Sequence, residues 1–159
     1  MRQETSETAV RKSVTVNCPV ENAFRVYTEQ VGSWWPFERT HSVTKADVET
    51  VVLEGGEGGR FYERTKSGDE HLWGTVVVWD PPNRLVHSWH PGRDEETSQR
   101  VEVTFTPDGD GTRVELVHTG WERLGERMTD AIASYETGWE TVLGRYVEAA
   151  KGVGANLAR

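Results

Sequence analysis

The fold is organised around RLGERMTDAIASYETGWETVLGRYVEAAK, the segment from Arg123 to Lys151. Its apolar side chains recur at spacings of three and four residues, which is typical of an amphipathic helix with one buried face. The predicted inner face consists of Met128, Ile132, Tyr135, Trp139, Val142, Leu143, Tyr146 and Ala150. Because three of these eight residues are Tyr or Trp, the helix should bring large aromatic rings with polar tips against a wide partner surface.

The residues upstream of this helix show strand and turn patterns. The clearest strand pair is predicted at 99–106 and 112–119, joined by the turn sequence PDGDG. Val101, Phe105, Val114 and Leu116 share one predicted face of this pair, and charged residues occupy the other face. One face is therefore expected to be buried and the other to be solvated.

The order of the predicted elements indicates the fold class. Further strands are predicted at 9–17, 48–54, 60–65, 70–79 and 84–90, with a bulge or kink at Gly74. Strands followed by one long helix favour an α+β fold, in which a curled antiparallel β-sheet of about six to seven strands grips the C-terminal α-helix. One or two short helices should follow the first strand, beginning at Val20. We expect a single domain over 1–159, with frayed residues at 1–8.

Composition argues against several classes of protein. The net charge is −8, with 26 acidic and 18 basic residues, which disfavours a nucleic-acid partner. No apolar run is long enough for a membrane-spanning helix, and the first residues lack the apolar segment of a secretory signal. Cys18 is the only cysteine, so no internal disulfide can form. The expected location is the cytoplasm.

Four segments resemble one known superfamily over nearly the whole chain. They are GGRFYERT at 58–65, HLWGTVVVWDPPNRLVHSWH at 71–90, VEVTFTPDGDGTRVELVHTGW at 101–121 and YETGWETVL at 135–143. Together they resemble the START/Bet v-like helix-grip superfamily (SRPBCC). The branch is the one named after the C-terminal domain of the activator of heat-shock-protein-90 ATPase, the AHSA family.

The resemblance implies a curled sheet that grips the C-terminal helix around an apolar cavity. Members of the superfamily use the cavity for lipid or polyketide carriage, for cyclisation, or make co-chaperone contacts instead. The chaperone activators that give the branch its name carry an additional N-terminal chaperone-binding domain, whereas the first strand is expected here about nine residues into the sequence. The co-chaperone role is therefore not transferred, and the branch offers no catalytic motif to transfer.

The aromatic residues are the main indication of a binding site. Seven tryptophans are more than core filling readily explains, because each buried indole N–H needs an acceptor. An apolar pocket lined by aromatic rings is typical of a small-molecule site. The candidate ligand-binding residues are Trp34, Trp35, Phe37, Phe61, Trp73, Trp89, Val103, Phe105, Leu116, His118, Tyr135 and Trp139. Trp34, Trp35 and Phe37 are expected near the mouth, and Tyr135 and Trp139 are expected to form the roof.

The candidate catalytic residues are His118, His87 and Glu63. A neutral imidazole in a cavity can act as a general acid or base, although a hydrogen-bonded structural histidine is the favoured alternative for both histidines. His87 and His90 would point to opposite faces of a strand, so we predict no metal site. No cofactor is predicted either.

Three functions remain open from the sequence. The favoured hypothesis is a module that binds an apolar or aromatic small molecule, lipid-like or polyketide-like, between sheet and helix. The alternatives are a cyclase or dehydratase on the same scaffold and a chaperone-associated interaction domain. The binding module is preferred to an enzyme because no paired acid–base motif is present. A chaperone contact and a homodimer are kept as further partner hypotheses.

Overall fold

The computed structural model describes residues 9–36, 47–91 and 95–157. Phe37, a candidate ligand-binding residue, lies outside the described residues. Among the helices that are described, none is both long and apolar enough to cross a membrane.

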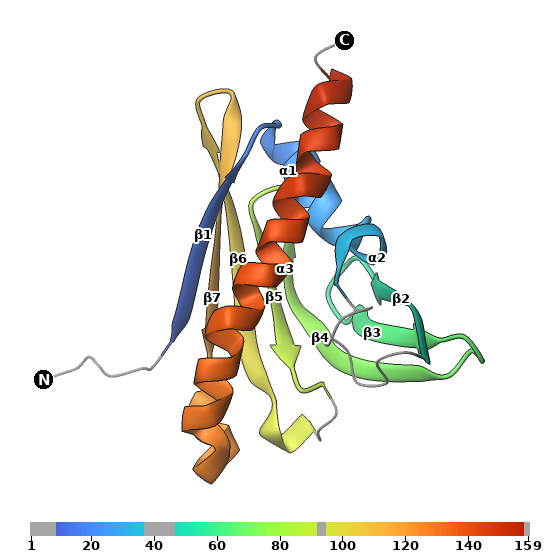
Figure 1. Cartoon of the computed structure of the whole chain (residues 1–159), viewed down its shortest axis with the longest axis vertical. Coiled ribbons are helices and arrows are strands. Elements are labelled where there is room, and N and C mark those ends of the chain that lie inside the picture. Colours follow the sequence, from blue (N-terminus) through green and yellow to red (C-terminus); the bar gives the residue numbers. More distant parts are fainter. Residues whose placement is uncertain (1–8, 37–46, 92–94, 158–159) are drawn as a thin grey trace, which may run out of the picture.

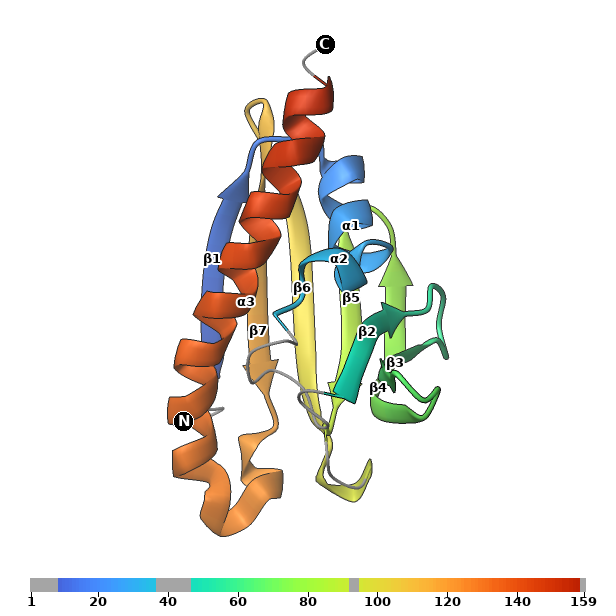
Figure 2. The ribbon, with the colours of Figure 1, turned by 45° about the vertical axis from the view of Figure 1, so that its right-hand side comes forward.

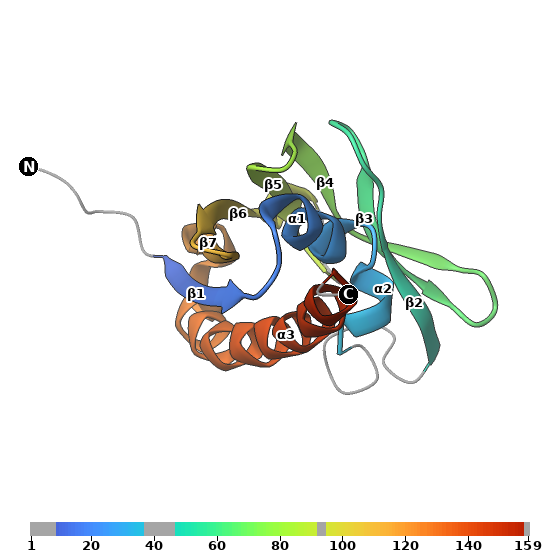
Figure 3. The same ribbon diagram turned by 90° about the horizontal axis from the view of Figure 1, so that it is seen from above.

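Seven strands form one antiparallel sheet in the order β1-β7-β6-β5-β4-β3-β2. They are β1 (Val10–Val16), β2 (Val48–Leu53), β3 (Arg60–Thr65), β4 (Glu70–Asp80), β5 (Arg84–Trp89), β6 (Gln99–Asp108) and β7 (Gly111–Thr119). Strands β2 to β7 are neighbours in sequence and in space, while β1 pairs with β7 and lies at the edge opposite β2. Seen from above, the sheet curls around the long helix (Figure 3). The predicted curled sheet is confirmed.

Two short helices follow β1, as predicted: α1 (Val20–Thr28) and α2 (Val31–Trp34). The 3₁₀ segment η2 (Glu95–Thr97) precedes β6, and η3 (Trp121–Arg127) leads into the long helix α3 (Met128–Leu157). The regular α-helix begins at Met128 rather than at Arg123, because Gly125 has φ 58° and ψ −123° and interrupts helical geometry. Hydrophobic periodicity alone does not detect such a break.

Helix α3 lies across the concave face of the sheet (Figure 1). Its buried residues are Trp139, Val142, Leu143, Tyr146 and Ala150, whereas Met128, Ile132 and Tyr135 are only partly buried against the core. Figure 2 shows α1 and α2 beside the C-terminal half of α3, with η3 at the opposite end of the molecule. The hydroxyl of Tyr146 donates to the carbonyl oxygen of Ala23 in α1 at 2.8 Å, which joins the two helices.

The strand pair β6–β7 has the register that the sequence predicts. Val103 pairs with Leu116 and Phe105 with Val114, and all four side chains are buried. Val101 is also fully buried. A shift of one residue would have exposed this whole apolar set, so the alternation of the sequence specifies the register.

A bulge between β3 and β4 sets the direction of Trp73. Phe61 pairs with Gly74 and Tyr62 with Leu72, so Trp73 is the additional residue on β4. Trp73 is 1% exposed and belongs to the hydrophobic core, so its side chain points to the buried face of the sheet. A Cβ atom on Gly74 would collide with the backbone carbonyl of Ser88, so only glycine fits there. The irregularity expected at Gly74 is therefore confirmed.

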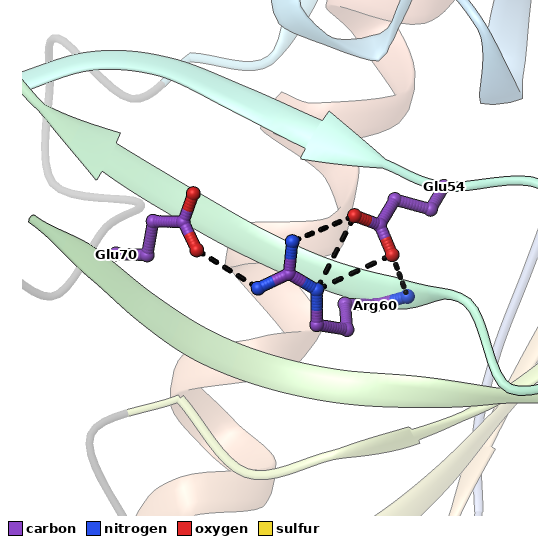
Figure 4. Close-up of polar contacts among 3 residues, drawn as sticks. All are labelled: Glu54, Arg60 and Glu70. Carbon is purple, nitrogen blue, oxygen red and sulfur yellow. Dashed lines mark hydrogen bonds and ion pairs between the residues drawn. The ribbon is translucent and has the colours of Figure 1, made fainter. Parts of the chain in front are cut away.

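The outer face of β2, β3 and β4 carries a charged triad (Figure 4). The guanidinium of Arg60 lies 2.7 Å from Oε2 of Glu54 and 2.8 Å from Oε1 of Glu70. The same guanidinium lies 4.5 Å from the ring centroid of Tyr62. All three charged groups are exposed, so the triad marks the solvated side of the sheet and adds little stability.

Candidate functional site

Four indoles meet between the sheet and α3. Trp35 follows α2, and the others come from β4, β5 and α3. Ring centroids of Trp35 and Trp89 lie 6.1 Å apart, and each of these two rings also contacts Trp73 and Trp139 at 5.2–6.0 Å. We call Trp35, Trp73, Trp89 and Trp139 the indole cluster. At these distances the rings pack against one another across the interior.

Three indole N–H groups of this region donate to polar side chains that are themselves candidates. Trp73 Nε1 donates to Oε1 of Glu63 at 2.8 Å, and Trp89 Nε1 donates to the hydroxyl of Tyr135 at 2.9 Å. Trp139 Nε1 donates to Nδ1 of His118 at 2.9 Å. The polar groups predicted from the sequence thus lie around the indole cluster, as acceptors for its rings.

Both ring nitrogens of His118 are used inside the fold. Nδ1 accepts from Trp139, so the proton of the neutral ring lies on Nε2, which donates to Oε1 of Gln99 at 2.7 Å. The imidazole also stacks on Trp121, with ring centroids 4.0 Å apart. An imidazole held in this way has its acceptor lone pair occupied, which favours a structural role for His118 over proton transfer.

His87 is held differently. It is fully buried on β5, and its Nδ1 lies 2.9 Å from the carbonyl oxygen of Ser88. Burial lowers the pKa of His87 from 6.5 to about 4, although the hydrogen bond to Ser88 acts in the opposite direction. Among the described residues Nε2 has no hydrogen-bond partner. The rings of Phe61 and Trp89 are its aromatic neighbours, at 5.1 and 5.7 Å.

Glu63 brings a carboxyl group to the same interior. It is 0% exposed on β3 and pairs in register with His71 of β4 and Val51 of β2. A buried carboxyl group that contacts an aromatic ring system is a chemically plausible acid–base group. Its Oε1 accepts the N–H of Trp73, a hydrogen bond that a carboxylate and a carboxylic acid can both accept.

The remaining candidates separate into a second region under α1. Phe105 contacts Phe24 and Tyr27, with ring centroids 5.1 and 5.8 Å apart, and Val103 and Leu116 are fully buried beside it on β6 and β7. Trp34 contacts both Tyr27 and Trp35, so it joins this region to the indole cluster.

Trp34 and Trp35, which the sequence places near a cavity mouth, are each only 3% exposed. The structure therefore puts them inside the core. Sequence reasoning gave Gln99 and Trp121 no role, because their partners depend on the packing of separate elements.

A surface pocket adjoins the indole cluster at the start of α3. It has a volume of about 310 Å³ and is lined by Leu124, Arg127, Asp130, Ala131 and Tyr135. We call it the Tyr135 pocket. Tyr135 lines this pocket, and its hydroxyl accepts the N–H of Trp89. In the described part of the chain, no group of three His, Cys, Asp or Glu residues is arranged to hold a metal ion.

Comparison with known families agrees with this architecture. The family model described as "Activator of Hsp90 ATPase homolog 1-like protein" matches residues 17–150. The chain belongs to this family. The resemblance that the four sequence segments indicated is thereby confirmed. A comparison with curated protein sequences finds no match.

Several solved structures are similar to this member of the family. The anthrahydroquino-gamma-pyrone synthase Txn09 is 32% identical, with a TM-score of 0.60 over 89% of this chain and 96% of Txn09. CalC of Micromonospora echinospora, described as a self-sacrificing resistance protein, is 30% identical, with a TM-score of 0.69 over 92% of this chain and 96% of CalC. NE0264 of Nitrosomonas europaea is 17% identical with a TM-score of 0.65, over 92% of this chain and 96% of NE0264, a likeness of fold alone.

Proposed function

We propose that this chain binds an aromatic small molecule at the indole cluster, between the sheet and α3. The observation that carries the proposal is the position of Tyr135. Tyr135 lines the Tyr135 pocket, and its hydroxyl is hydrogen-bonded to Trp89 within the cluster. A ligand in the pocket is therefore separated from the cluster by one side chain.

Binding at the cluster requires Tyr135 to turn away from Trp89. The turn breaks the hydrogen bond to Trp89, which contributes about 0.5–1.5 kcal/mol net. It also separates the ring of Tyr135 from His118, Trp121 and Trp139. A ligand that buries about 150–250 Å² of aromatic surface gains about 4–6 kcal/mol before the costs of association. The non-helical backbone at Gly125 lies between Leu124 and the other residues that line the pocket, so η3 and α3 do not form one continuous helix there. A ligand whose rings replace the ring contacts of Tyr135 would therefore open the pocket toward the indole cluster.

The similar structures support a ligand of this class. Txn09 is described as a synthase of an anthrahydroquino-gamma-pyrone, a name that denotes a polycyclic aromatic product, and the identity of 32% extends over most of both chains. The interior described above supplies rings for stacking and a few polar groups for orientation, as small-molecule sites do.

A titration with 2-methoxynaphthalene tests the proposal. We expect saturable binding at one site per chain, with a change in tryptophan emission. Tyr135→Ala should lower the dissociation constant several-fold, because it removes the tyrosine side chain that separates the pocket from the indole cluster. Tyr62→Ala is the matched control, since Tyr62 lies under Arg60 on the outer face of β3 and should leave binding as in the parent protein. Absence of binding up to the solubility limit, or equal effects of the two substitutions, would overturn the proposal.

A second candidate function is acid–base catalysis on an aromatic or polyketone substrate. Two observations favour it: Glu63 and His87 are buried beside the indole cluster, and Txn09 is described as a synthase. Glu63→Gln separates the two candidates, because the amide oxygen can still accept the N–H of Trp73. Loss of turnover with retained probe binding in Glu63→Gln would support catalysis by Glu63. If the parent protein binds a polyketone without converting it, binding would be the only one of the two functions left.

The other partners predicted from the sequence stay predictions. A chaperone-docking domain needs an exposed apolar patch. Among the described residues the exposed large apolar side chains are Leu72 and Val77, at 37% and 52%, both on β4. Two such residues do not by themselves favour a docking surface over an interior site. The homodimer, the single-domain extent and the cytoplasmic location likewise stay predictions.

A further inference from the structure

His87 is the buried titratable group that the packing of the indole cluster does not explain. It is 0% exposed, on β5, and it pairs in register with Val76 of β4 and Val101 of β6. Both of these neighbours are apolar and buried. An apolar side chain would pack equally well at this position, so the imidazole calls for a chemical reason.

The tautomer of His87 follows from one hydrogen bond. A backbone carbonyl can only accept, so the contact of Nδ1 with the carbonyl oxygen of Ser88 places the proton on Nδ1. Nε2 then carries a lone pair. The low pKa of about 4 keeps the ring in this neutral form around pH 7, so Nε2 remains an acceptor there.

The surroundings of Nε2 do not satisfy this acceptor. No donor among the described residues lies within hydrogen-bond distance, and the nearest rings are those of Phe61 and Trp89. Trp89 belongs to the indole cluster, and its own N–H is already donated to Tyr135. A buried acceptor without a donor costs about 1–3 kcal/mol, so a donor brought by a ligand would recover that cost.

We propose that Nε2 of His87 accepts a hydrogen bond from a hydroxyl group of the bound aromatic ligand. The ligand class is thereby narrowed to hydroxylated aromatic molecules. This inference rests on the proposed function, because it assigns an orienting residue within the same site. His87 is then a specificity-determining residue, which favours a phenol over the same ring system without a donor.

Two probes that differ in one donor test the inference. 2-Naphthol carries a hydroxyl donor, whereas in 2-methoxynaphthalene the same oxygen is methylated. Isothermal titration calorimetry at pH 7 should show that the parent protein binds 2-naphthol about tenfold more tightly, the contribution of one hydrogen bond to a buried acceptor.

Substitution of His87 should remove this preference. His87→Phe keeps an aromatic ring at this position but has no acceptor nitrogen. The dissociation constant of 2-methoxynaphthalene divided by that of 2-naphthol should therefore fall from about ten to one or below. Val76→Ala is the matched control, because it changes the packing beside His87 without changing any hydrogen bond. In Val76→Ala both affinities should change alike, and the roughly tenfold preference should persist.

The outcomes separate this inference from the proposed function. If neither probe binds the parent protein, the proposed function and this inference both fail. If both bind with equal affinity, or if His87→Phe keeps the preference, only the inference on His87 fails. Should His87→Phe not fold, the ¹⁵N resonance of Nε2 in the parent protein decides. It should shift on addition of 2-naphthol and not of 2-methoxynaphthalene, and equal responses would refute the hydrogen bond.

Discussion

The indole N–H of Trp139 lies 2.9 Å from Nδ1 of His118 and joins α3 to β7 by a buried side-chain hydrogen bond. The bond fixes the tautomer of His118, and it fixes the rotation of α3 about its axis at this level. It also explains why an aromatic helix face requires a polar residue on the facing strand, since a buried indole N–H needs an acceptor. Two predictions concern this pair.

The first prediction concerns the size of the packing contribution of Trp139. The ring is 2% exposed and contacts Trp35, Trp89 and Tyr135. Trp139→Ala should therefore lower the free energy of unfolding by about 3–5 kcal/mol, the range for a large buried side chain. Urea unfolding measures this change. A loss well below this range would mean that Trp139 covers an open space, as the sequence hypothesis of a cavity roof requires.

The second prediction concerns the role of His118. In His118→Leu the N–H of Trp139 loses its acceptor and Oε1 of Gln99 loses its donor. Each buried group left without a partner should cost about 1–3 kcal/mol in the free energy of unfolding. Trp139→Phe is the informative comparison, because it removes the donor to Nδ1 and leaves the hydrogen bond between His118 and Gln99 in place. If His118→Leu unfolds at the same urea concentration as the parent protein, the structural role of His118 is excluded.

Patterns local in sequence were sufficient for much of the fold. The alternation around Val103 and Leu116 predicted the β6–β7 register, and the spacing of Tyr135 and Trp139 predicted that they share the inner face of α3. In both cases the period of a single element decides which side chains are buried. The aromatic rings of the predicted helix face meet the predicted inner face of the strand pair, and the rings of Tyr135 and His118 lie 5.0 Å apart.

Other features depend on packing between distant segments. The hydrogen bond from His118 to Gln99 joins two residues that are 19 apart in sequence, at the open end of the β6–β7 hairpin, and nothing near either residue indicates it. Trp35 lies outside the regular helices and strands, where no period shows that it is buried in the indole cluster. The residues that line the Tyr135 pocket lie on both sides of Gly125, whose backbone break interrupts a pattern that otherwise reads as continuous helix.

The third prediction concerns pH and His87. The pKa of a histidine is 6.5 in the unfolded reference and about 4 for His87 in the fold, because burial disfavours the charged ring. As the pH falls through 6.5, the unfolded chain takes up a proton that the folded chain does not bind until about pH 4. Titration of His87 should therefore lower the free energy of unfolding by up to about 3 kcal/mol as the pH falls from 6.5 to about 4. Below about pH 4 this group should cause no further loss.

Carboxyl groups titrate over part of the same range, so the measurement is a difference between two proteins. Urea unfolding of the parent protein and of His87→Phe from pH 8 to pH 4 gives two curves of stability against pH, and the stability of the parent protein should fall relative to that of the variant as the pH falls. His87→Phe lacks this titrating group, so its free energy of unfolding should fall by less over the same pH range. Parallel curves would show that His87 binds its proton equally well in both states.

The last prediction compares two glycines that the structure treats in opposite ways. A Cβ atom on Gly144, in the middle of α3, would meet no atom within 4 Å, whereas on Gly74 it would collide with the carbonyl of Ser88. Gly144→Ala should raise the free energy of unfolding by about 0.5–1 kcal/mol, because alanine loses less backbone entropy in a helix. Gly74→Ala should lower it by more than that amount, because the bulge that directs Trp73 into the core must shift. Thermal unfolding of the two variants gives the signs directly. A stable Gly74→Ala protein would mean that β4 can move away from β5, and the packing of Trp73 in the indole cluster would then not depend on the bulge.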